Sequence, residues 1–208
     1  MKKILFFLFS LNFIFSCEKP CIERYHFEFP VSLSPEQDTF QIGDTLFLEL
    51  SYTPSLLENI DNGDLIDIKD YDFGFEALVS KFDSTSELDA LDYFTFGSSI
   101  GQLSRNYLVG ISVLELKPEQ VTEKRVLDFY LIPQQKGNFH FSFLSLNEDH
   151  TNDSELLGSK CDEILTVDFN LNDKADNNFD YYNSNSINEK GTLESSLKSG
   201  FYAFVVIE

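Results

Sequence analysis

Three cysteines have the most distinctive chemistry in this sequence, because a thiol can be acylated, oxidised to a disulfide or bound to a metal. They are Cys17, Cys21 and Cys161, and the first two stand close together in LNFIFSCEKPC. Neither Cys21 nor Cys161 lies in the CxxC or CxH patterns of zinc sites, so we expect no metal site on them and no cofactor. Acylation and disulfide formation remain, and the residues around each cysteine indicate which of the two reactions it undergoes.

A short apolar segment precedes Cys17. Lys2 and Lys3 lead into an apolar run over residues 4–15. A membrane-spanning helix needs about 20 residues, so a positive start followed by a shorter apolar run favours a secretory signal.

The end of this segment, Ile14-Phe15-Ser16-Cys17, resembles the lipobox of bacterial lipoprotein precursors. The resemblance implies cleavage after Ser16, so that residues 1–16 are a lipoprotein signal peptide, and lipidation of Cys17. Several acyl chains hold a soluble domain firmly at a membrane surface. The alternatives are an ordinary cleaved signal with Cys17 as a spare thiol, or an uncleaved anchor.

Lipidation of Cys17 would leave Cys21 and Cys161, an even number in a compartment that permits disulfides. A bridge between them would tie the start of the mature chain to a late strand. The alternative is two free thiols, with Cys161 buried as a small apolar residue.

The charge of the chain limits its partners. Removal of Lys2 and Lys3 with the signal would leave 13 basic against 35 acidic residues, a formal charge of −22. Such a field disfavours nucleic acid and anionic lipid headgroups. Because 22 Phe and 9 Tyr supply a large core, we expect a folded domain with an acidic surface.

Catalytic motifs are not found. The sequence has no GxSxG, HExxH or phosphate-binding glycine loop, and His26, His140 and His150 fit ordinary sheet and loop positions. We therefore predict that the protein is not an enzyme. The alternative is a glycoside-type envelope hydrolase using paired carboxylates, for which 35 acidic residues offer many pairs.

Two acidic loops, 61–70 and 147–155, contain the hard oxygen ligands that Ca²⁺ requires. Neither has the spacing of an EF-hand loop, and Asn62-Gly63 is typical of a tight hairpin turn. We expect a plain turn at the first loop and a solvated tip at the second.

A third polar segment carries aromatic residues. Phe179, Tyr181 and Tyr182 lie in an Asn-rich stretch, where exposed aromatic rings would be candidate ligand-binding residues. The alternative, which we favour, is that they pin the connection onto the domain. The absence of Trp also weakens a glycan-binding role.

The elements that must position these residues are strands, because apolar and polar residues alternate. Tyr25, Phe27 and Phe29 share one face of a run that Pro30 is expected to end. Leu46, Leu48, Leu50 and Tyr52 share a face opposite Phe47, Glu49 and Ser51. The same alternation predicts paired strands that contain Ile66 and Ile68 and then Tyr71, Phe73 and Phe75. Further strand candidates are residues 92–96, 107–116, 125–132, 138–146, 163–171 and 201–207. One short helix is expected from Ser186 towards Lys198, ending at Gly200.

Together these elements predict an all-β, antiparallel immunoglobulin-like β-sandwich with a short C-terminal helical or loop elaboration. The turn at Gly43-Asp44, and a turn at Gly137 with positive φ that leads Phe139, Phe141 and Phe143 inward, are similar to turns of bacterial immunoglobulin-like domains. With the lipobox, they resemble the immunoglobulin-like lipoproteins of Bacteroidota. We expect a lipidated N-terminus and first strand over 17–37, then one domain over 38–208 with an Asn-rich insertion at 172–199.

The resemblance implies no catalytic residue and no ligand. We expect a cell-envelope lipoprotein, held in a membrane by its N-terminal lipid and facing the periplasm or the cell surface. We predict a non-enzymatic binding or interaction module whose partner is an envelope protein or a glycan, and not nucleic acid.

Overall fold

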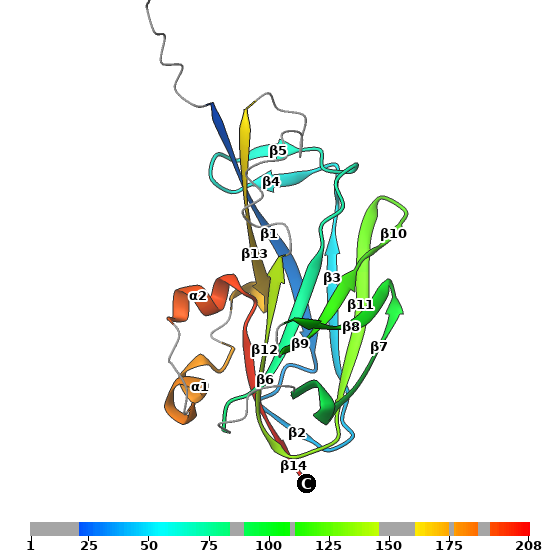
Figure 1. Ribbon diagram of the computed structural model, residues 1–208, viewed down its shortest axis with the longest axis vertical. Helices are drawn as coiled ribbons and strands as arrows, with labels where there is room; N and C mark the ends of the chain where they lie inside the picture. The colour runs from blue at the N-terminus through cyan, green and yellow to red at the C-terminus, as the bar shows by residue number, and fades with distance from the viewer. Residues whose placement is uncertain (1–20, 84–89, 109–110, 146–160, 175–176, 187–191) are drawn as a thin grey trace, which may run out of the picture.

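The computed structural model describes residues 21–83, 90–108, 111–145, 161–174, 177–186 and 192–208. These residues form a β-sandwich of two mixed sheets with two short helices near the C-terminus, which confirms the predicted fold class (Figure 1). Within this part of the chain, no helix is long and apolar enough to span a bilayer.

Sheet A contains two long strands that flank the core, β1 near the start of the chain and β13 in its later part. Its order is β10-β11-β3-β1-β13, and β7 also pairs with β11. The bounds are β1 Ile22–Ser34, β3 Leu46–Tyr52, β7 Phe94–Ile100, β10 Glu119–Val121, β11 Lys124–Pro133 and β13 Asp162–Leu171. Its pairs are antiparallel except β1–β13, which is parallel over ten residues from Ile22↔Asp162 to Val31↔Leu171.

Sheet B has the order β2-β14-β12-β6-β9-β8, with β2 and β14 parallel. The bounds are β2 Thr39–Gln41, β6 Phe75–Lys81, β8 Gln102–Leu108, β9 Ile111–Lys117, β12 Gly137–Ser145 and β14 Tyr202–Ile207. The remaining elements are the hairpin of β4 Leu57–Asn59 and β5 Asp64–Ile66, the 3₁₀ turns η1 Ala90–Tyr93 and η2 Asn172–Lys174, and the helices α1 Phe179–Asn185 and α2 Leu193–Lys198.

The core lies between the two sheets and is built largely from phenylalanine rings. Phe29 of β1 contacts Phe75 of β6 with ring centroids 4.9 Å apart, and Phe143 of β12 contacts Phe169 of β13 at 5.3 Å. The alternating residues predicted to face inward are buried, namely Phe27, Phe29, Leu46, Leu48, Leu50, Tyr52, Phe139, Phe141 and Phe143. Because each such side chain contributes about 1.5 to 3 kcal/mol on burial, this layer is the main stabilising feature.

Three strand predictions need correction. β1 continues through Pro30 to Ser34, since pairing with β3 begins only at Val31 and the missing N–H of Pro30 faces no β3 partner in that ladder. The predicted strand 107–116 is instead parts of the hairpin strands β8 and β9, and the start of the predicted strand 92–96 is the 3₁₀ turn η1. Ile68, Tyr71 and Phe73, expected in strands, lie between β5 and β6 and outside both, although Ile68 and Phe73 are buried.

The predicted helix is correct at its end, since α2 ends at Lys198, but wrong at its start, since Ser186 follows a separate helix, α1. Ser186, expected to start the helix, ends α1, and its N–H donates to the Tyr182 carbonyl at 2.7 Å. Thr192 caps α2 instead, accepting from the Ser195 N–H at 3.2 Å. Gly200 ends α2 with φ +56°, as predicted.

Of the two predicted turns, the one at Gly43 is confirmed, with φ +92°. Gly137 is not left-handed but begins β12, where an added Cβ would lie 2.6 Å from Lys81 Cε. β1 also pairs within sheet A, so the first strand belongs to the same sandwich as residues 38–208.

Candidate functional site

Two adjoining hollows, together called the groove here, lie on the outer face of sheet A and are lined mainly by residues that alternate with the core positions. One part has a volume of about 420 Å³ and a second part about 200 Å³, and Ser32 and Glu49 line both. Their other lining residues come from β1, β3, β7, β11 and β13 and the adjoining turns: Pro30, Val31, Ser34, Glu36, Phe47, Leu48, Ser51, Ser99, Asp128, Phe129, Asn170, Asn172 and Asp173. The strand alternation that fills the core therefore also builds this groove.

One end of the groove is rich in amides. Asn172 and Asp173 follow β13 in left-handed conformations, with φ of 47° and 57°, which Asn and Asp tolerate better than most residues. The Leu33 N–H donates to Asn172 Oδ1 at 2.9 Å, and Asn170 Nδ2 donates to Glu28 Oε1 at 2.9 Å. Among the described residues, the buried atoms Asn172 Nδ2 and Asn170 Oδ1 have no hydrogen-bond partner.

Two carboxylates meet in the middle of the groove. Glu49 of β3 stands directly opposite Asp128 of β11 in the antiparallel ladder. Like charges in such positions repel one another. Buried Asp128 Oδ1 has no hydrogen-bond partner in the part of the chain that the structure describes, and none of the described lining residues is Lys or Arg. The middle of the groove therefore favours a ligand that brings hydrogen-bond donors.

The other end of the groove is aromatic. Phe47 is 57 % exposed on the outer face, with Tyr130 of β11 and Ser34 of β1 as its cross-strand partners. The Tyr130 ring lies over Gly97 of β7, where an added Cβ would come 2.5 Å from the Tyr130 hydroxyl. An exposed ring beside hydroxyls and carboxylates suits a ligand with both an apolar face and donor groups.

The predicted cysteine sites lie away from this groove. Cys21 and Cys161 are joined by a disulfide with Cα atoms 4.8 Å apart, at the start of the parallel pair β1–β13. The Asp162 N–H also donates to the Cys21 carbonyl at 2.9 Å. Cys17 and the signal segment lie outside the described residues.

The aromatic residues of the Asn-rich segment pack against sheet B. Phe179 is 6 % exposed in a cluster with Phe82, Phe201 and Ala203, and the Tyr182 ring contacts Phe201 at 5.0 Å. Tyr181 is partly exposed and donates its hydroxyl to Asn138 Oδ1 at 2.9 Å. These contacts match the packing alternative, since Phe179 and Tyr182 are engaged by the domain itself.

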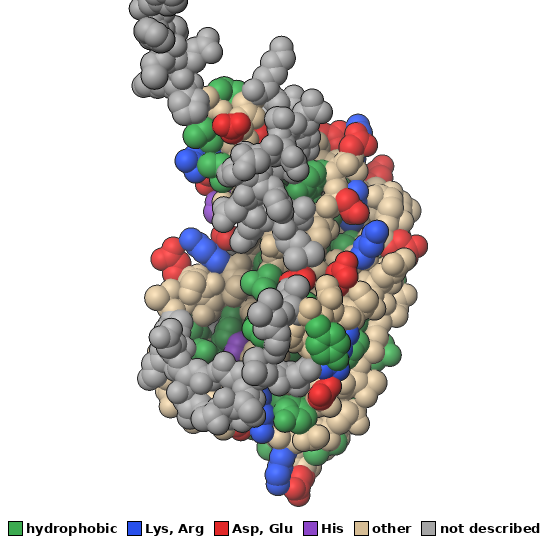
Figure 2. All heavy atoms as spheres, viewed as in Figure 1, with side chains coloured by type: hydrophobic (Ala, Val, Ile, Leu, Met, Phe, Trp, Pro, Cys, Tyr) green, Lys and Arg blue, Asp and Glu red, His purple; other side chains and the backbone are tan. Residues whose placement is uncertain are grey.

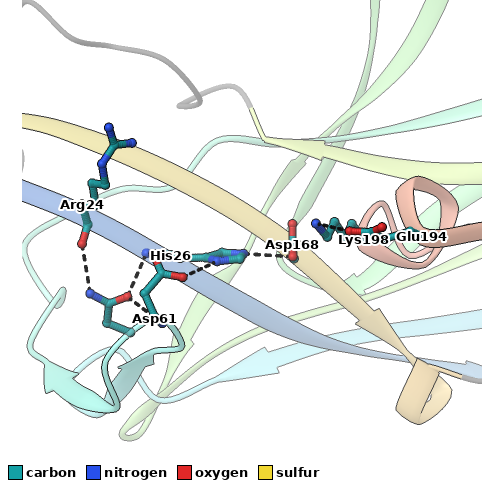
Figure 3. A network of polar contacts seen from close by, with 7 residues as sticks. Arg24, His26, Asp61, Asp168, Glu194 and Lys198 are labelled. Carbon is teal, nitrogen blue, oxygen red and sulfur yellow. Dashed lines mark hydrogen bonds and ion pairs between the residues drawn. The ribbon is translucent and has the colours of Figure 1, made fainter.

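The two described histidines have different surroundings. His26 lies between two carboxylates, with Nδ1 3.0 Å from Asp61 Oδ1 and Nε2 2.9 Å from Asp168 Oδ2 (Figure 3). His140 lies among aromatic rings, and its burial lowers its pKa to about 4. His150 is outside the described residues. No hydroxyl or thiol nucleophile contacts either ring among the contacts that the structure describes.

The first acidic loop is the tight turn of the β4–β5 hairpin, as predicted. Asn62 Oδ1 accepts from the Asp64 N–H at 3.0 Å, and Gly63 is left-handed with φ +80°. Among the described residues, no three His, Cys, Asp or Glu side chains are grouped to hold a metal ion. The second loop, 147–155, lies outside them.

Sequence reasoning did not single out the groove. The pattern placed Phe47, Glu49 and Ser51 on one strand face, and this was the only signal available. That Asp128 and Asn170 join them depends on the strand order of sheet A.

No protein-family model and no curated protein matches the sequence. Among solved structures, the human F-spondin reeler domain is similar at 15% identity and a TM-score of 0.35, over 60% of this chain and 82% of that chain. The C-terminal domain of the Streptococcus agalactiae AgI/II polypeptide BspA has 10% identity and a TM-score of 0.32, covering 67% and 50%. A cohesin module of a Clostridium perfringens family 33 glycoside hydrolase has 12% identity and a TM-score of 0.30, covering 68% and 98%. This likeness is too distant to indicate a function.

The strand order and the core define the class of the protein as a β-sandwich of two mixed sheets. The outer face of its sheet A is grooved and carries acidic side chains.

Proposed function

We propose that this protein is a membrane-tethered lipoprotein of the cell envelope that acts as a non-enzymatic binding module. The groove of sheet A is its binding site. The observation that carries the proposal is the combination, in one groove, of the exposed Phe47 ring with the facing carboxylates Glu49 and Asp128. Such a surface offers a ligand an apolar contact and hydrogen-bond acceptors, and none of the described lining residues is a Lys or Arg that would compete for them.

The ligand is an envelope protein segment or a glycan that presents donor groups to the carboxylates. Glu36, Glu49, Asp128 and Asp173 give the groove negative charge, which attracts cationic groups and repels nucleic acid. Phe47 supplies the apolar contact that orients the ligand.

Affinity capture from intact cells with a matched pair of variants tests the site. Phe47→Ala removes the exposed ring of the groove, whereas Tyr107→Ala removes a ring that is 66 % exposed on sheet B. We expect mass spectrometry and glycan profiling to recover a partner with the wild type and Tyr107→Ala, and several-fold less with Phe47→Ala. Equal recovery with both variants would reject the groove, and recovery of no partner would reject the binding role.

The tether is tested separately by fractionation. Cys17→Ser should block labelling with radioactive fatty acid and move the chain from the membrane to the soluble envelope fraction. Unchanged membrane retention would reject the lipoprotein assignment and leave the groove untouched.

The opposed carboxylates Glu49 and Asp128 are the observation that favours the alternative function, glycoside hydrolysis. Incubation of the chain with envelope glycans and measurement of new reducing ends tests it, with Glu49→Gln as the matched variant. Release by the wild type and none by Glu49→Gln would replace binding by hydrolysis.

A further inference from the structure

Large apolar side chains are exposed at the end of the sandwich where the described chain begins. The β4–β5 hairpin lies across this end, beside the first residues of β1 (Figure 1). Leu57 and Asn59 of the hairpin are buried, whereas Leu56 is 60 % exposed, Ile60 42 % and Leu65 62 %. Leu65 pairs with Glu58, so both lie on the face of the hairpin opposite Leu57 and Asn59. Ile22, the first residue of β1, adds a fourth apolar side chain that is 45 % exposed.

The hairpin is fixed to β1 by polar contacts (Figure 3). Asn59 Oδ1 accepts from the His26 N–H at 3.1 Å, and Asn59 Nδ2 donates to the Arg24 carbonyl at 3.0 Å. The Ile60 N–H donates to the His26 carbonyl at 2.9 Å, and the His26 ring lies 3.0 Å from Asp61. Because these bonds join the β4–β5 hairpin to β1, they fix the direction of the hairpin's outward face relative to the start of β1.

The proposed lipid enters the membrane close to this end. Only residues 18–20 separate Cys17 from Cys21, and a chain of this length spans at most about 14 Å. Cys21 is itself held to Cys161 by the disulfide. The acyl chains on Cys17 would therefore enter the bilayer beside Ile22 and the hairpin.

We infer that this end of the molecule, formed by Ile22, Leu56, Ile60 and Leu65, lies in the interface of a phospholipid bilayer. The inference rests on the proposed lipid tether, and it adds the surface and the orientation with which the protein meets the membrane. Apolar side chains at the headgroup boundary add binding to that of a covalent lipid. The C-terminal end, with β2 and β14, then points away from the bilayer (Figure 1).

Charge at this end indicates the kind of lipid. Glu23, Glu58 and Asp64 neighbour the exposed apolar residues in the sequence and outnumber the exposed basic residue there, Arg24. Figure 2 shows acidic, basic and hydrophobic side chains at this end. Because acidic residues repel anionic headgroups, the matching surface is zwitterionic, as in phosphatidylcholine or phosphatidylethanolamine.

The absence of Trp allows a clean measurement, because one introduced Trp reports alone. Leu65→Trp places the reporter on the hairpin, and Ile207→Trp places it at the opposite end, where Ile207 is 44 % exposed. Both lipidated full-length chains are bound to phosphatidylcholine vesicles with brominated acyl chains. We expect roughly twofold or greater quenching at Leu65→Trp and little at Ile207→Trp, with a blue shift of emission only at Leu65→Trp.

Flotation of the vesicles separates the two hypotheses. If the chains float and Leu65→Trp is quenched no more than Ile207→Trp, the membrane-facing end is rejected while the lipid tether stands. If neither chain floats, the tether fails and the inference fails with it. Leu56→Trp, at a position with similar exposure, repeats the test if Leu65→Trp does not fold.

Discussion

His140 is a titratable side chain enclosed by aromatic rings on the outer face of sheet B. Its ring centroid lies 5.1 Å from that of Tyr182 and 5.1 Å from that of Phe201. Among the described residues, its buried Nδ1 has no hydrogen-bond partner. Burial disfavours the charged ring and lowers the pKa of His140 to about 4, so the ring is neutral at pH 7.

This environment predicts a loss of stability in mild acid. Between pH 6.5 and about 4, the unfolded chain binds a proton at His140 that the folded chain does not, so the free energy of unfolding falls as pH falls through this window. Above pH 6.5, His140 is neutral in both the folded and the unfolded chain and costs no stability. Near pH 4, the free energy of unfolding is lower by about 3 kcal/mol because of this residue.

Urea unfolding at several pH values between 7 and 4 measures this effect. His140→Phe keeps an aromatic ring of similar shape and should show a smaller loss of stability over that range than the wild type. The same pH dependence in both proteins would assign the effect to other groups.

At the scale of elements, α1 packs on sheet B through Phe179 and Tyr182, of which Phe179 is the buried ring. Phe179→Ala should destabilise the protein by about 3 kcal/mol, because it removes a buried aromatic side chain and leaves a cavity. Tyr181→Phe on the same helix is the control, since it removes only one exposed hydroxyl contact with Asn138 and should cost less than about 1 kcal/mol. Thermal unfolding of both variants checks the difference, and equal melting temperatures would contradict this view of α1.

Gly101 lies between β7 of sheet A and β8 of sheet B, where the chain crosses between the sheets. Its φ is +78°, and an added Cβ would come 2.8 Å from the Lys117 carbonyl oxygen and 2.7 Å from Leu127 Cδ1. Gly101→Ala should therefore cost more than the roughly 1 kcal/mol of left-handed strain alone.

Gly43→Ala is the matched control, because Gly43 is also left-handed with φ +92° but has nothing within 4 Å of an added Cβ. Chemical unfolding should show a clearly larger loss of stability for Gly101→Ala. A loss no greater than that of Gly43→Ala would mean that β9 and β11 shift without cost.

The elements also show where sequence patterns reach their limit. Long strands such as β3, β12 and β13 were predictable, because a sheet with one buried face requires alternation. The helix boundaries were not predictable. Ser186 has the spacing of a helix start, but its N–H donates to the Tyr182 carbonyl at the end of α1. Local hydrogen bonds of Ser serve either role, and only the packing of Phe179 and Tyr182 on sheet B decided between them.

At the scale of the whole molecule, the disulfide closes a loop that runs from the start of β1 to the start of β13. Cys21 and Cys161 are separated by 140 residues, and the chain-entropy model gives such a loop about 4 to 5 kcal/mol. The double variant Cys21→Ala/Cys161→Ala should lose a stability of this order in urea. Non-reducing mass mapping provides the check, and alkylation of both thiols without prior reduction would contradict the bridge.

The sequence by itself determined the all-β class and the inward faces of the long strands, because alternation records which side of each strand avoids water. It also predicts a lipoprotein of the cell envelope, since the resemblance to a lipobox rests on contiguous residues. Only the tertiary structure decided that β1 pairs in parallel with β13, and that Glu49 meets Asp128 across two strands.

The groove and the end that we infer to face the membrane are likewise tertiary features. Phe47, Asp128 and Asn170 are far apart in sequence, and the strand order of sheet A brings them to one surface. Ile22 and Leu65 are also far apart, and the hydrogen bonds between the β4–β5 hairpin and β1 bring them to one end. The physical reason is that a pattern of period two specifies the face of a residue but not its neighbour in the next strand.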